Sequence, residues 1–143
     1  MRISDAEKLL RAETARVVGC TEPAAIAFAV QAARRQLKGP IDPATVRLRL
    51  SVSPEVRRNA STAVVPGIGR RGVRAAAAAG LLSRAEGFNP FAGLRLSPSH
   101  PLLRRSGWLL VSTARRRGIF IRAEIATPSG RAAAVVAGRH DRV

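Results

Sequence analysis

The stretch VRLRLSV at residues 46–52 alternates apolar with polar side chains. A period of two is typical of a β-strand with one buried face and one solvated face. Three further apolar segments downstream, at residues 108–113, 119–127 and 131–137, also favour strands, and Pro128-Ser129-Gly130 predicts the turn between the last two. The second half of the chain is therefore expected to form most of a sheet.

Upstream of residue 46 the pattern changes to helical spacing. Ser4 and Glu7 form a capping box that opens a first helix, and Gly19 lies where its C-terminal cap is expected. A second, apolar helix begins within residues 20–23 and ends before Gly39. Helices followed by strands predict an α+β fold, with this N-terminal helix pair packed on a mainly antiparallel sheet.

The chain has 143 residues, which suits one domain over residues 1–143. Hydrophobic residues make up 46% of it but aromatic residues only 3%, so alanine, valine and leucine must fill the core. A single cysteine excludes an internal disulfide, and it excludes a self-contained metal site built on several thiolates.

The formal charge of +16 is the feature that suggests a nucleic-acid partner. The basic residues are spread along the whole chain, however, and few aromatic residues lie near them for base stacking. We therefore disfavour nucleic acid as a partner. The longest uncharged stretch, residues 23–33, is too short to span a bilayer, so we expect no membrane segment, a cytoplasmic location and a reduced thiol at Cys20.

The middle of the chain is read as a less regular segment from Pro54 to Val65, a glycine-rich stretch at residues 66–72 and an alanine-rich helix at about 73–85. The glycines match the dinucleotide fingerprint in spacing, but no second parallel strand with an acidic end follows, which disfavours a Rossmann site. Glycines that lead into a helix expose N–H groups able to hold a phosphate or carboxylate. A tight turn is the alternative interpretation.

Cys20 is the sharpest candidate for chemistry. It lies between a helix-ending glycine and a helix start, where free N–H groups and the helix dipole stabilise a thiolate. The alternative is a small buried hydrophobic residue. Glu22, two residues later, favours the same helix end, and its alternative role is to complement the helix dipole.

The sequence GCTEP at residues 19–23, followed by an alanine-rich helix, resembles the signature of the L-cysteine desulfidases, which belong with the α chain of iron–sulfur L-serine dehydratases. Other stretches follow in the order of that family: the 45–52 strand with Ser53 and Asn59, PGIG at 66–69, and the late strands up to His140. The resemblance implies a lyase that releases ammonia and pyruvate from a small amino acid, with a 4Fe–4S cluster as Lewis acid.

Carried over to this chain, the resemblance makes Cys20 a cluster ligand or catalytic thiolate and Glu22 a second catalytic residue. Thr21 and Asn59 would line the substrate site, and Gly67 and Gly69 would hold the substrate carboxylate. A cubane needs about three or four thiolates, and this chain supplies one.

We therefore expect a truncated or split lyase component that needs a second subunit to supply the missing cysteines. A catalytically silent module that binds an anion or a protein is one alternative. A basic nucleic-acid-binding protein is another.

Overall fold

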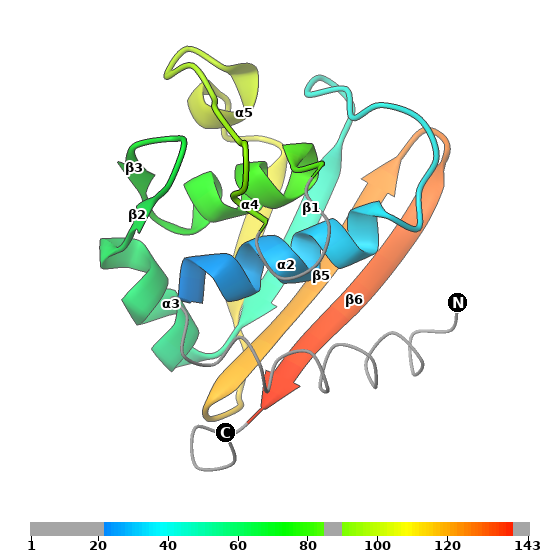
Figure 1. Cartoon of the computed structure of the whole chain (residues 1–143). Helices are drawn as coiled ribbons and strands as arrows, with labels where there is room; N and C mark the ends of the chain where they lie inside the picture. The colour runs from blue at the N-terminus through cyan, green and yellow to red at the C-terminus, as the bar shows by residue number, and fades with distance from the viewer. Residues whose placement is uncertain (1–21, 85–89, 139–143) are drawn as a thin grey trace.

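The computed structural model describes residues 22–84 and 90–138 of the chain. The elements follow in the order α2 (Glu22–Arg34), β1 (Arg47–Val52), α3 (Pro54–Thr62), β2 (Val64–Val65), β3 (Arg70–Arg71), α4 (Val73–Leu82), α5 (Pro101–Arg104), β4 (Leu109–Thr113), β5 (Ile119–Thr127) and β6 (Gly130–Gly138). In Figure 1 the helices α2 and α4 lie together on one face of a four-stranded sheet.

The sheet has the strand order β4-β1-β5-β6. Strand β1 pairs with β5, and β5 with β6, in antiparallel fashion, whereas β4 runs parallel to β1. The predicted α+β class with a mainly antiparallel sheet is confirmed. Of the predicted helix pair, the second member is α2, and the first lies outside the described residues.

The core lies between the sheet and the two helices. The alternation in β1 works as predicted: Leu48, Leu50 and Val52 are buried toward the helices, while Arg47 and Arg49 are exposed. Helix α4 contributes a run of buried alanines, and Gly80 lies where α2 crosses it. A Cβ at Gly80 would come within 2.6 Å of the carbonyl oxygen of Ala27. Small residues thus let the two backbones approach closely, which explains a core with so few aromatic side chains.

The prediction of a less regular segment at residues 54–65 is wrong, because Pro54–Thr62 forms helix α3. Ser53 is its N-cap and accepts a hydrogen bond from the N–H of Val56 at 3.3 Å, and Pro54 occupies the tolerated first position. The short strands β2 and β3 pair as a hairpin across the glycine stretch, and the single turn α5 was also not predicted.

Candidate functional site

Two residues singled out in the sequence meet at the beginning of α2. Nδ2 of Asn59, in α3, donates a hydrogen bond of 2.9 Å to Oε1 of Glu22, the first residue of α2. The two residues are 37 positions apart in the chain. Glu22 is half-buried and Asn59 is exposed, so the pair is open to solvent on one side.

Helix α3 positions Asn59 because its opposite face is anchored in the core. Val56 and Ala60 are buried, and Ser53 is buried at the N-terminal end of the helix. The Ser53 hydroxyl also donates to the carbonyl oxygen of Gly118 at 2.6 Å, which ties the start of α3 to the segment before β5. Asn59 therefore projects from a fixed helix rather than from a loop.

Glu22 is held at the N-terminal end of α2 by the buried residues that follow it. Pro23 and the seven residues after it are all buried, so the first turn of this helix is embedded in the fold. A carboxylate in the first turn is also favoured by the positive end of the helix dipole. Geometry and charge together keep the Glu22 side chain at the surface next to α3.

Cys20 and Thr21 lie outside the described residues, and so does His140. The predicted roles of Cys20, as a catalytic thiolate or metal ligand, and of Thr21, in lining the substrate site, stay predictions.

Gly67 and Gly69 lie in the turn between β2 and β3, both with positive φ angles, +82° and +70°. Gly67 faces the backbone of another segment. A Cβ there would collide with the carbonyl oxygen of Leu94, and the carbonyl oxygen of Gly67 accepts a hydrogen bond from the N–H of Leu96 at 3.1 Å. The N–H of Gly69 donates to the carbonyl oxygen of Val65 at 3.0 Å. These contacts describe a tight turn that packs on residues 94–96, and the predicted role in holding a substrate carboxylate stays untested.

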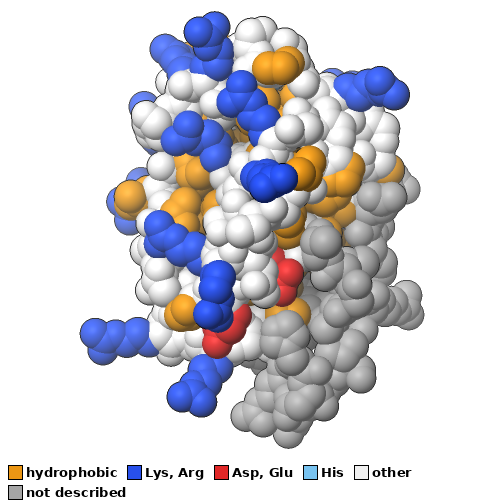
Figure 2. Space-filling view, turned by 90° about the vertical axis from the view of Figure 1, so that its left-hand side faces the viewer, with side chains coloured by type: hydrophobic (Ala, Val, Ile, Leu, Met, Phe, Trp, Pro, Cys, Tyr) orange, Lys and Arg blue, Asp and Glu red, His pale blue; other side chains and the backbone are white. Residues whose placement is uncertain are grey.

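The glycine stretch leads into α4, as the sequence predicted. Gly72 is the N-cap with φ +105° and gives the helix no side-chain cap. Arg70 and Arg71 precede it, and both are exposed. Figure 2 views the end of the molecule that carries α3 and the β2–β3 hairpin, and it shows basic side chains spread over this face with few acidic ones among them. Coulombic attraction at this end favours an anionic ligand.

The residues present do not fit a 4Fe–4S cluster. Within residues 22–84 and 90–138, no group of three or more His, Cys, Asp and Glu side chains could hold a metal ion. The chain contains one cysteine, and a cubane takes about three or four thiolates. The cluster therefore stays a prediction that depends entirely on a second chain.

In the part of the chain that the structure describes, no helix combines the length and the apolar character needed to cross a membrane.

Comparison with known proteins connects the chain to larger ones. A UPF0597 protein of Nitratidesulfovibrio vulgaris (strain Miyazaki F) is 32% identical over 145 residues, an alignment that covers 97% of this chain but 32% of the relative. The UPF0597 protein TTE0269 of Caldanaerobacter subterraneus is 27% identical over 140 residues, an alignment that covers 94% of this chain and 32% of the relative. The UPF0597 protein YhaM of Shigella dysenteriae is 39% identical over 79 residues, an alignment that covers 55% of this chain and 16% of the relative.

These relatives are UPF0597 proteins. No family model matches the chain. The predicted membership in the L-cysteine desulfidase and iron–sulfur L-serine dehydratase family is therefore wrong, since the relatives carry a different family name. The GCTEP motif covers only five residues and the helix after it is rich in alanine, so together they are weak evidence for one family. The chain spans about a third of the length of the first two relatives.

Proposed function

We propose that this chain is one component of a lyase that acts on a small amino acid by α,β-elimination and is active only with a second chain. The observation that carries the proposal is the hydrogen bond between Asn59 and Glu22. It joins two residues from different helices that the resemblance assigned to one site. The relatives are about three times as long as the aligned region, which supports a site that needs more chain than is present here.

In this proposal Glu22 is the general base. Asn59 holds one carboxylate oxygen, and the other accepts no hydrogen bond from the described residues. That second oxygen can take the α-proton of the substrate while the leaving group departs from the β-carbon with the bonding electrons. The leaving group then takes up the proton. The resulting 2-aminoacrylate tautomerises to an imine, and water hydrolyses this imine to pyruvate and ammonia.

Asn59 is a positioning residue in this scheme. Its amide fixes the rotamer of Glu22 on the exposed side of α2, and this reduces the conformational freedom that the base would otherwise lose on binding substrate. The positive charge of the chain attracts the carboxylate of the substrate. A cluster, if the assembly uses one, would take at most Cys20 from this chain, and no step proposed here depends on it.

The second candidate function is a binding module without catalysis. The position of Glu22 favours this function in one respect. An acidic residue in the first turn of a helix stabilises that helix whether or not it reacts, and the hydrogen bond from Asn59 holds Glu22 there. Such a module would bind an anionic small molecule or a protein. It would depend on Glu22 for stability only.

The test is to mix the purified chain, under anaerobic conditions, with the remaining part of the Nitratidesulfovibrio relative. Pyruvate and ammonia release from L-serine and from L-cysteine would then be measured. We expect no turnover by the chain alone and turnover by the mixture. We expect this turnover to fall about 10²–10⁴-fold in Glu22→Gln and to be kept in Asp42→Asn, an exposed carboxylate with the same change of charge.

Robust turnover by the chain alone would refute its dependence on a partner. If the mixture formed no pyruvate and the chain still bound an amino acid equally well with Glu22→Gln, the binding module would replace the lyase.

A further inference from the structure

The face of the sheet opposite α2 and α4 carries arginines on three neighbouring strands. In the register of β1, β5 and β6, Arg47 lies opposite Ala126, and Ala126 lies opposite Arg131. Residues directly opposite each other in antiparallel strands point to the same face. The residues that alternate with Arg47 and Arg49 are buried under the helices, so these arginines project from the other side.

These arginines surround a hollow of about 610 Å³. It is lined by Gln36, Arg47, Arg49, Arg122, Glu124, Ile125, Ala126, Arg131, Ala132 and Ala133. Ala126 lies between Arg47 and Arg131, and Ala133 lies on the edge strand β6 in the row Arg49–Glu124–Ala133. Neither alanine carries a side chain beyond Cβ that could fill the space. We call this surface the arginine groove.

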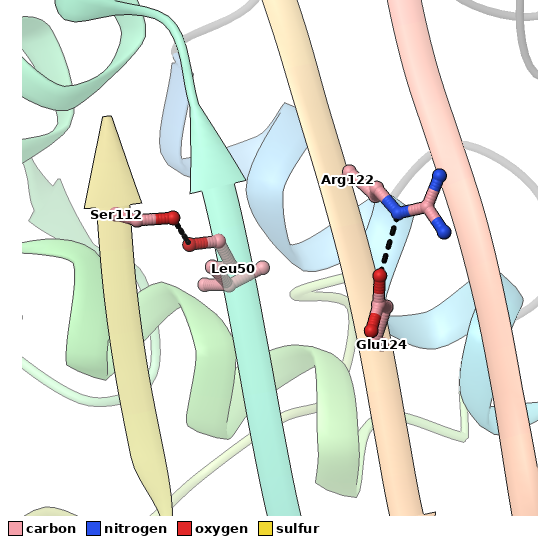
Figure 3. Close-up of polar contacts among 4 residues, drawn as sticks. All are labelled: Leu50, Ser112, Arg122 and Glu124. Carbon is pink, nitrogen blue, oxygen red and sulfur yellow. Dashed lines mark hydrogen bonds and ion pairs between the residues drawn. The ribbon is translucent and has the colours of Figure 1, made fainter. Parts of the chain in front are cut away.

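The charge of the arginine groove is mostly uncompensated. Its one carboxylate, Glu124, accepts a bond of 2.7 Å from Nε of Arg122. Figure 3 shows the two side chains next to each other on β5, on the face turned away from the helices. Arg47, Arg49 and Arg131 have no carboxylate partner among the described residues.

Most guanidinium donors of the groove are available to a ligand. One nitrogen of Arg47 donates to the neighbouring carbonyl oxygen of Val46 at 2.8 Å. Within the described part of the chain, the guanidinium groups of Arg49 and Arg131 donate no hydrogen bond, and both residues are exposed. A guanidinium presents its N–H groups in a planar fork that matches two oxygens of one phosphate group.

We propose that the arginine groove binds the phosphate groups of a ligand that carries at least two of them. The phosphates would lie over Ala126 and Ala133 and accept hydrogen bonds from Arg47, Arg49 and Arg131. Three uncompensated cations match a multiply charged anion better than a single carboxylate. A small di- or triphosphate and a nucleic-acid backbone share this chemistry. The lining contains no aromatic side chain for base stacking, so binding is independent of base sequence. This site is separate from Glu22 and Asn59 and does not depend on the proposed lyase activity.

The test uses two double variants with the same loss of charge. Arg49→Ala with Arg131→Ala removes two groove donors, whereas Arg95→Ala with Arg104→Ala removes two exposed arginines outside the groove. The probes are inorganic pyrophosphate, followed by titration calorimetry, and a short single-stranded DNA of mixed sequence, followed by fluorescence anisotropy. Circular dichroism checks that each variant is folded.

We expect the groove variant to lose at least about tenfold in affinity and the control variant less than about twofold, because charge-assisted hydrogen bonds depend on position and non-specific attraction does not. Ala126→Glu keeps every arginine but fills the groove with a negative charge, and it should weaken binding as strongly. A loss confined to pyrophosphate identifies a small phosphorylated ligand, and a loss that includes DNA identifies a nucleic-acid backbone. Equal losses in the two double variants, or no binding of either probe by the unmodified chain, would overturn the proposal.

Discussion

Asn59 Nδ2 lies 2.9 Å from Glu22 Oε1, and this hydrogen bond connects the middle of α3 to the first turn of α2. The bond is exposed, so it contributes little to folding and its main effect is on the orientation of the Glu22 carboxylate. Loss of the Asn59 amide should therefore change the orientation of the Glu22 carboxylate more than the stability of the fold.

Asn59→Ala should reduce the free energy of unfolding by no more than about 1 kcal/mol, since the pair is open to water. Urea unfolding measures this value. Turnover by the two-chain mixture should fall by a much larger factor, because Glu22 would lose its fixed orientation. Ser61→Ala is the matched control on the same helix, since among the described residues the Ser61 hydroxyl bonds only to the carbonyl oxygen of Arg58. An equal loss of activity in both variants would argue against a positioning role for Asn59.

Ser53→Ala should lower the stability of the fold more than the loss of one hydroxyl group suggests. Ser53 is fully buried, caps α3 and donates to the carbonyl oxygen of Gly118. Loss of an N-cap costs about 0.5–2 kcal/mol, and the acceptor left without its partner adds to that cost. Thermal unfolding should show a lower midpoint than for Ser61→Ala. Similar midpoints would mean that the cap contributes little here.

Gly67→Ala and Gly69→Ala form an informative pair. Both positions have a positive φ angle, which costs an L-residue roughly 1–2 kcal/mol. Only Gly67 also faces a backbone atom, the carbonyl oxygen of Leu94, whereas the space beside Gly69 is open. Chemical denaturation should therefore show a clearly larger loss of stability for Gly67→Ala. Equal losses would indicate that the 94–96 segment moves away without cost.

Gly80→Val tests the close approach of α2 and α4. A Cβ at residue 80 meets the backbone of Ala27 at 2.6 Å and Cβ of Val30 at 2.7 Å. Overpacking of this kind costs about 1–3 kcal/mol or more, so the unfolding midpoint in urea should fall. Gly107→Ala serves as control, because nothing lies within 4 Å of its added Cβ. A Gly80→Val variant as stable as the control would contradict the close helix contact.

The elements that the sequence predicted well are those with a clear period or a continuous apolar run. The alternation at residues 46–52 and the apolar runs at 119–127 and 131–137 correspond to β1, β5 and β6. Helix α3 was missed because only Val56 and Ala60 of it are buried, so its hydrophobic pattern is weak, and its signal lies in the Ser53-Pro54 start. The capping chemistry could have revealed it.

The candidate site could be predicted only in part. The choice of Glu22 and Asn59 rested on the order of short motifs, and their contact depends on how α2 and α3 pack, which no local pattern encodes. The arginine groove shows the same limit. Alternation placed Arg47 and Arg49 on a solvated face, but their neighbours Arg122 and Arg131 follow only from the strand register.

A double-mutant cycle on turnover by the two-chain mixture tests the central claim most directly, with the variants Glu22→Gln, Asn59→Ala and both together. If Asn59 acts through Glu22, the double variant should be no less active than Glu22→Gln alone. Losses that multiply, or turnover that neither substitution changes, would contradict the claim that these two side chains form one site.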